Sequence, residues 1–229
     1  MRLDKFFSHL KYGSRRDMKT FFKAEVVKVN GNRITDPAYH IEPGHDDITL
    51  NEVAVFYEDP VHLVIHKPPG YLSANRDAIH PCVVELVNPP YDRFDYAIAG
   101  RLDLDAEGLM VLTTDGPLAH RITSPNSHLP KTYAVTLEKP FKHDKTLLKG
   151  VSVKDGKGRP YMAKALAIEH RDDQVIITID EGKFHQVKRM FEATGHTVVR
   201  LVRLRIGNLA LGDLAPGEHR PFKEAELYD

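Results

Sequence analysis

The segment at residues 100–109 has the greatest chemical potential in the sequence, because it carries three carboxylates, Asp103, Asp105 and Glu107, between two glycines. In an extended segment, side chains two positions apart project to the same side. Asp103 or Asp105 could therefore be a nucleophile, or the two could bind a metal together. Residue types alone favour a third interpretation, an acidic surface loop.

The remaining reactive side chains do not assemble into a recognisable site. The 13 histidines are scattered, and His62 and His66 fall in a predicted strand without the glutamate of a zinc-hydrolase motif. Cys82 is the only cysteine, so one chain can form neither an intramolecular disulfide nor a cysteine-based zinc site. The sequence predicts no metal site, and its cysteine content fits the reducing cytoplasm.

Length and composition are those of an ordinary soluble globular protein. With 229 residues, 41% of them hydrophobic and 28% charged, the chain can form one or two domains and is too hydrophobic to be disordered. No stretch approaches the roughly 18 uninterrupted apolar residues that span a bilayer, and the start lacks the apolar core of a signal peptide. We therefore expect a cytoplasmic protein without a membrane role.

The N-terminal segment is basic, although the net charge of the whole chain is zero. Between residues 2 and 28, eight basic residues stand against three acidic ones, which gives a local charge of +5 suited to phosphate binding. Apolar residues at helical spacing from Leu3 to Leu10 predict an amphipathic helix that ends near Gly13. A second helix is expected from Ser14, which forms an S-x-x-D capping box with Asp17.

Strand patterns follow these two helices. Residues 26–29, Ile34 and residues 48–50 predict short strands, with a tight turn at Asn30-Gly31, and residues 52–60 are expected to be a linker. Further strands are predicted at 62–66, 109–112, 133–137, 165–168 and 175–179, and one helix at 186–194. Because strands alternate only loosely with helices, we expect an α+β fold with a mixed, mainly antiparallel sheet.

The same segments, taken in order, resemble one family. Residues 100–109 resemble the G-R-L-D-x-D-x-x-G-L signature of bacterial rRNA pseudouridine synthases of the RsuA/RluB/RluE/RluF type. Residues 66–70 resemble the N-K-P-x-G motif of that family, with His66 in place of asparagine. Residues 131–133 resemble its K-x-Y motif, and residues 181–190 resemble its E-G-x-x-H-Q-V-K-R-M motif. Residues 214–222 resemble its C-terminal motif. The N-terminal unit resembles the S4 RNA-binding domain.

This resemblance implies an enzyme that isomerises one uridine of ribosomal RNA to pseudouridine, breaking the C1′–N1 bond and joining C1′ to C5, without ATP, redox cofactor or metal. Asp103 matches the catalytic aspartate, which would attack C1′, attack the base or help to form a glycal. Tyr133 matches a tyrosine that lies against the flipped base, with its phenol oxygen near the C5 proton. Lys188 matches the basic partner of the catalytic carboxylate, with Arg189 as second choice.

The resemblance also assigns the domains and partners. It implies an S4-like αα-hairpin domain at residues 1–51, the linker at 52–60 and the synthase domain at 61–229. The expected partner is 16S rRNA in a ribosomal particle or assembly intermediate, because residues 181–190 have the form found in small-subunit enzymes, and the protein is expected to be a monomer. The residues expected to contact RNA are all basic: Arg2, Lys5, Arg15, Arg16, Lys19, Lys67, Arg101 and Arg189.

The sequence leaves three alternative functions: a 23S rRNA synthase of the same family, a non-catalytic ribosome-assembly factor and an aspartate-nucleophile hydrolase. The joint presence of Asp103, Tyr133 and Lys188 speaks against the assembly factor, and a hydrolase would leave the basic N-terminal unit without a purpose. Ala106 and Glu107 stand where the family commonly has threonine or serine, so we expect altered bracing of the loop rather than lost activity.

Overall fold

The chain divides into two units. The computed structural model describes residues 1–228, together with their side chains except at position 125. One unit contains Met1–Val61 together with Asn88–Asp95, and the other contains the rest of the described chain.

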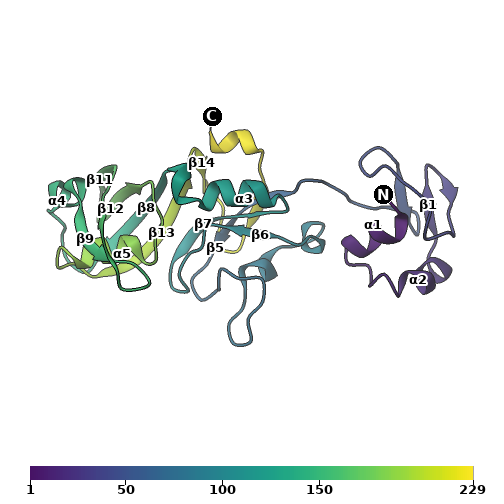
Figure 1. Cartoon of the computed structure of the whole chain (residues 1–229), viewed down its shortest axis with the longest axis horizontal. Coiled ribbons are helices and arrows are strands. Elements are labelled where there is room, and N and C mark those ends of the chain that lie inside the picture. The colour runs from purple at the N-terminus through teal and green to yellow at the C-terminus, as the bar shows by residue number, and fades with distance from the viewer. Residues whose placement is uncertain (229) are drawn as a thin grey trace. The chain divides into compact units, whose positions relative to one another are not determined.

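Two short helices and a small antiparallel sheet form the N-terminal unit (Figure 1). The helices are α1 (Leu3–His9) and α2 (Met18–Ala24), and the sheet has the order β2 (Asn32–Arg33), β1 (Val27–Val29), β3 (Ile48–Leu50), β4 (Val53–Ala54). Their apolar faces bury one another in a single core. Asn30 and Gly31 have φ angles of 52° and 78°, so the predicted tight turn is confirmed.

Two boundaries differ from the expectation. The second helix begins at Met18 rather than Ser14, because the backbone N–H and the hydroxyl of Ser14 both donate to Asp17 Oδ2, at 2.9 and 2.6 Å, and close a separate turn. The segment expected to be a linker begins inside a hairpin, in which Asn51 and Glu52 adopt positive φ and β4 pairs with β3.

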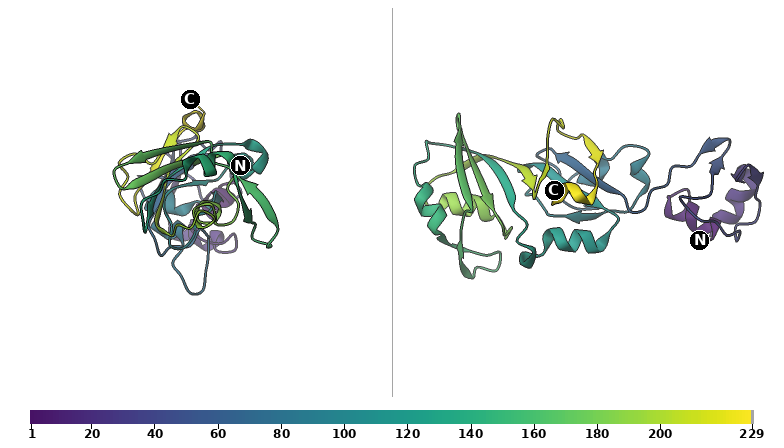
Figure 2. Two further views of the ribbon diagram at one scale, coloured as in Figure 1. Left: turned by 90° about the vertical axis from the view of Figure 1, so that its left-hand side faces the viewer. Right: turned by 90° about the horizontal axis from the view of Figure 1, so that it is seen from above.

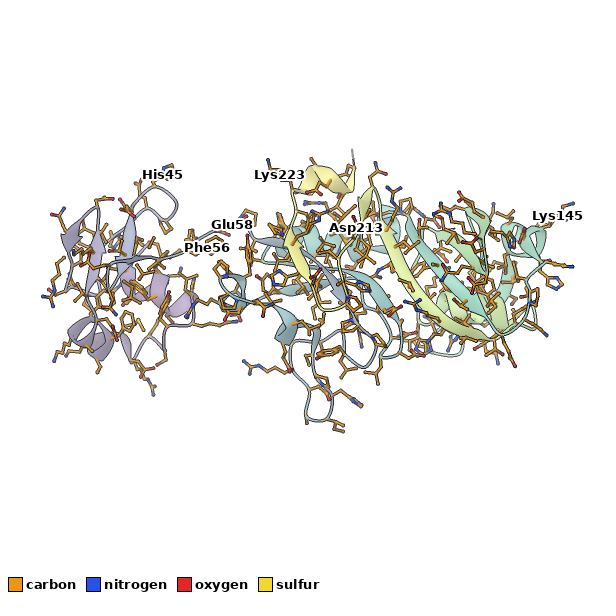
Figure 3. The ribbon with its side chains drawn as sticks, turned by 180° about the vertical axis from the view of Figure 1, so that it is seen from behind. His45, Phe56, Glu58, Lys145, Asp213 and Lys223 are labelled. Carbon is orange, nitrogen blue, oxygen red and sulfur yellow. The ribbon has the colours of Figure 1, made fainter. Side chains whose placement is uncertain are left out.

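Residues 88–95 also join this unit, although we expected them within the catalytic domain. Phe56, labelled in Figure 3, packs edge-on against Tyr91 with ring centroids 5.2 Å apart. Lys11 Nζ lies 3.1 Å from Asp95 Oδ1. Aromatic packing and an ion pair therefore hold this segment in place.

One large mixed sheet forms the framework of the second unit. Its main path runs β11 (Ala167–Arg171), β12 (Gln174–Ile179), β8 (Lys131–Leu137), β13 (Val198–Ile206), β7 (Glu107–Thr113), β5 (His62–Lys67), β15 (His219–Pro221). In addition, β14 (Leu209–Ala210) pairs with β13, and β6 (Ala97–Ala99) pairs with β7. The pairing of β7 with β13 is parallel and the other pairings are antiparallel, which confirms the predicted mixed, mainly antiparallel sheet.

Short helices and a separate hairpin pack around this sheet (Figures 1 and 2). Helix α3 (Gly116–Thr123) contacts β6 and β7, α4 (Asp144–Lys149) contacts β11, and α5 (Gln186–Glu192) contacts β13 and the hairpin of β9 (Val151–Lys154) and β10 (Pro160–Ala163). Single 3₁₀ turns lie in this unit at Val83–Leu86, Pro125–Ser127 and Glu224–Leu227, and in the N-terminal unit at Tyr91–Arg93. Within residues 1–228, no helix is long and apolar enough to cross a membrane.

The centre of the sheet positions the segments of chemical interest. Strand β7 is buried along its whole length, and the loop at residues 100–106 enters it from β6. Tyr133 lies on β8, and residues 180–185 connect β12 to α5. Segments far apart in the sequence therefore meet beside β7, β8 and β13.

Candidate active site

The loop at residues 100–106, strand β8 and the segment before α5 line an open pocket. Asp103 comes from the loop, Tyr133 from β8 and His185 from the position just before α5. The other lining residues are Arg101, Leu102, Ala106, Ile179, Gly182, Lys183, Gln186, Val187 and Leu201.

Lys67 braces the loop from inside the protein. Its side chain has no exposed surface, and its Nζ donates to the carbonyl oxygens of Ala106 at 2.7 Å, Pro68 at 3.0 Å and Leu104 at 3.3 Å. Burial lowers the pKa of the Lys67 ammonium to about 8, against the opposing effect of the charges of Asp105 and Asp103. The prediction that Lys67 contacts RNA was wrong, because a fully enclosed ammonium cannot reach a phosphate.

Arg203 holds the start of the same loop and the strand that follows it. Arg203 is 2% exposed, and its guanidinium donates to three main-chain oxygens: Nη2 to Gly100 at 2.8 Å, Nη1 to Arg101 at 3.4 Å and Nε to Leu109 at 2.7 Å. The backbone of Arg203 lies directly against Gly108, whose φ is +110°. A Cβ at Gly108 would lie 2.4 Å from the Arg203 oxygen, so this close approach requires glycine.

Asp103 and Asp105 share one cation. Lys188 Nζ lies 3.2 Å from Asp103 Oδ2, and 2.7 and 2.9 Å from the two oxygens of Asp105. Its hydrogen bond to Asp105 lowers the pKa of that carboxyl group. Partial burial alone would lower the pKa of Lys188, but the two carboxylates outweigh burial and raise it. The loop is a turn rather than extended, since Ala106 N–H donates to the Asp103 carbonyl, yet both carboxylates reach Lys188.

Tyr133 and Lys131 lie on the same face of β8, two residues apart. Tyr133 is 6% exposed and borders the pocket, and in the described chain its hydroxyl has no hydrogen-bond partner. Lys131 is 7% exposed, and burial, with the nearby charge of Arg203, lowers the pKa of its ammonium to about 8. The pocket therefore contains an available phenol, and a buried cation lies on the same strand.

His185 is a pocket residue beside Asp103 that sequence reasoning missed. Its Nε2 lies 3.2 Å from Asp103 Oδ1, and its ring stacks on Phe184 with centroids 3.7 Å apart. The histidine stands in the quoted motif at residues 181–190, but nothing in its local spacing indicates that it reaches Asp103. That contact depends on how the sheet brings the two segments together.

The other basic residues predicted to contact RNA lie in different settings. Arg15, Arg16 and Lys19 are exposed, whereas Lys5 is half-buried and the guanidinium of Arg2 is bound to Asp4 at 2.7 Å. In the second unit Arg101 is exposed at the pocket. Arg189 donates to the Lys154 carbonyl and lies over the Phe184 ring, 4.9 Å from its centroid.

Two residues that depart from the family pattern have clear contacts. The Ala106 carbonyl accepts from Lys67, and the buried Glu107 carboxylate pairs with Arg200 on β13. Bracing at these two positions thus comes from a main-chain bond and an ion pair, and the hydroxyl that braces the loop is that of Ser73, which donates to the Leu102 carbonyl at 2.7 Å and accepts from the Leu102 N–H at 2.9 Å. No cluster of three or more His, Cys, Asp or Glu side chains within residues 1–228 could hold a metal ion.

Comparison with known proteins agrees with this architecture. The RNA pseudouridylate synthase family matches residues 61–193, the S4 domain matches residues 1–47, and the chain belongs to the RNA pseudouridylate synthase family. It is therefore an enzyme of that class, with an S4 domain before its catalytic domain.

Individual relatives cover the chain almost completely. An uncharacterised RNA pseudouridine synthase of Bacillus subtilis, YtzG, is 40% identical over 100% of this chain and 97% of its own length. Ribosomal small subunit pseudouridine synthase A of Escherichia coli is 39% identical over 99% of this chain and 98% of its own. A crystal structure of a pseudouridylate synthase superposes with a TM-score of 0.66 at 35% identity, covering 99% of this chain and 98% of that one.

Proposed function

We propose that this enzyme isomerises one uridine of small-subunit (16S) ribosomal RNA, in the cytoplasm, acting as a monomer on a ribosomal particle or assembly intermediate. The substrate assignment is supported by the name of the Escherichia coli relative, which matches nearly the whole chain at 39% identity. We further propose that residues 1–51 form an S4-like domain, residues 52–60 a linker and residues 61–229 the catalytic domain. The family match that begins at residue 61 supports the start of the catalytic domain.

The observation that carries the mechanism is the position of Asp103, in a pocket shared with Tyr133 and 3.2 Å from the ammonium of Lys188. In the reaction, the C1′–N1 bond breaks with its electron pair on the base, C5 joins C1′, the C5 proton leaves and N1 gains a proton. Asp103 acts on C1′, on the base or in glycal formation, and a carboxylate suits each route. Lys188, 3.2 Å from Oδ2, holds the Asp103 carboxylate in position.

Tyr133 supports the extruded uracil and relays the C5 proton. A flat ring replaces the stacking that the base loses on leaving its helix. The unpartnered hydroxyl supports the second role, since a phenylalanine would stack equally well.

RNA is held through phosphates on both units. In the N-terminal unit Arg15, Arg16 and Lys19 are exposed, and in the second unit Arg101 is exposed beside Asp103. Such contacts set position rather than sequence preference.

Two experiments test the proposal. Pseudouridine is mapped on both ribosomal RNAs from cells with and without the gene, and loss of one site in 16S rRNA is expected. Loss of a 23S site instead would overturn the substrate assignment. Purified Asp103→Asn, which removes the charge with little change in shape, should bind RNA and fail to isomerise it; activity within about tenfold of the parent would overturn the role of Asp103.

A further inference from the structure

Each oxygen of the Asp103 carboxylate lies beside a side-chain nitrogen of its own. Lys188 Nζ lies 3.2 Å from Oδ2, and His185 Nε2 lies 3.2 Å from Oδ1. The Asp103 side chain is 24% exposed, so the carboxylate stands at the pocket wall between these two groups.

Lys188 divides its contacts between the carboxylates of Asp103 and Asp105. It lies closer to both oxygens of Asp105, at 2.7 and 2.9 Å, than to Asp103. A single contact at Oδ2 would leave the carboxylate of Asp103 free to rotate about its Cβ–Cγ bond. A second contact at Oδ1 fixes that rotation.

His185 is itself fixed. Its φ of 51° is left-handed, a conformation that few residues with a Cβ adopt and that often marks functional positions. Its ring is nearly parallel to that of Phe184, with 21° between the planes. Phe184 packs in turn against the Arg189 guanidinium and close to Gly156 in the turn of the β9–β10 hairpin.

We propose that His185 is a positioning residue for Asp103, setting the direction in which its carboxylate faces the substrate. This inference rests on the proposed catalytic role of Asp103. Misplacement of a reacting group by about 1 Å can slow an enzyme about 100-fold, so loss of His185 acts on kcat. Substrate affinity, which depends on phosphate contacts elsewhere, is unaffected.

The test compares His185→Ala and His185→Gln by steady-state release of tritium from C5-labelled RNA. We expect His185→Ala to lower kcat about 10- to 100-fold with KM within twofold of the parent. Glutamine can place an amide nitrogen near the position of Nε2, so His185→Gln should recover most of the loss. Added imidazole should likewise restore part of the activity of His185→Ala.

His128→Gln is the matched control. His128 also has a left-handed φ, 47°, and its Nδ1 lies 3.0 Å from Asp180, but it does not line the pocket. Its kcat and KM should equal those of the parent.

The inference is overturned if His185→Ala keeps the parental kcat, or if His185→Gln is as impaired as His185→Ala and both losses are in KM. If His185→Ala fails to fold, as judged by circular dichroism, the kcat of His185→Gln decides, and a loss as large as that of Asp103→Asn overturns the inference. Asp103→Asn separates the two proposals. An active Asp103→Asn refutes the proposed mechanism, whereas an inactive Asp103→Asn beside a fully active His185→Ala refutes only the role of His185.

Discussion

Replacing Lys131 with methionine should stabilise the protein at neutral pH. The Lys131 side chain is 7% exposed, and within residues 1–228 no hydrogen bond from its ammonium reaches another residue. The guanidinium of Arg203 repels it, and the charge of Asp180 offsets only part of this. Methionine fills similar space without bringing a charge into the sheet.

The magnitude follows from the pKa of the buried amine. Burial lowers that pKa from its usual 10.5 to about 8. Each pKa unit corresponds to about 1.4 kcal/mol, so carrying the charged form costs the folded state about 3 kcal/mol. Methionine should raise the free energy of unfolding at pH 7 by an amount of this order.

The same linkage predicts a pH dependence of known sign. Below about pH 8, Lys131 is protonated in both the folded and unfolded states, and the full cost applies. Between pH 8 and 10.5 the folded state loses the proton first, so parental stability rises with pH. The advantage of Lys131→Met should therefore shrink by about 2 kcal/mol between pH 7 and 9.5. Urea unfolding followed by far-ultraviolet circular dichroism at both pH values measures it.

Lys67→Met is the contrasting control. Burial also lowers the pKa of Lys67 to about 8, but its ammonium donates to three carbonyl oxygens. Its loss leaves these acceptors unpaired, at about 1–3 kcal/mol for each buried group, so this variant should be destabilised. A Lys131→Met protein less stable than the parent at pH 7, or one with an unchanged pH slope, would refute the reasoning.

Three further predictions concern catalysis, RNA affinity and the loop. Tyr133→Phe keeps the ring and should bind RNA as the parent does but release tritium from C5 more slowly; parental release would rule out the proton relay. Reversing the charge of three exposed cations, Arg15, Arg16 and Lys19, should weaken RNA binding and reduce the slope of log affinity against log salt concentration by at least about 2. An unchanged slope in a filter-binding titration would show that these residues do not contact phosphate. Gly108→Ala should lower the free energy of unfolding by more than about 3 kcal/mol, because its Cβ would lie 2.4 Å from a backbone oxygen; a melting temperature equal to that of the parent would contradict this.

Local patterns predicted five strands of the large sheet but missed its central strand β13 and the short strands β6, β14 and β15. The apolar run of β13 is broken by Arg200, Arg203 and Arg205, and a buried arginine reverses the expectation that charged side chains face solvent. Helices α3 and α4 were also missed. They have eight and six residues, too few to be stable alone, so their helicity depends on packing that a local pattern does not contain.

In the site, too, local motifs predicted some residues, whereas contacts between distant segments were not predicted. The motifs pointed to Asp103 and Tyr133, which line one pocket, and to Lys188, which lies beside Asp103. They did not predict the enclosure of Lys67, which depends on carbonyl groups of a distant loop, or the contact of His185 with Asp103. Both follow from strand pairing across the sheet.

Lys67 and Arg203 hold the loop at residues 100–106 entirely through main-chain oxygens. Every residue type supplies such an oxygen, so the course of the loop does not depend on the identity of exposed side chains such as Arg101. Natural divergence or a laboratory library can exchange those side chains while the backbone beneath them keeps its path. The exposed surface of the loop can therefore change while the backbone that carries Asp103 stays in place.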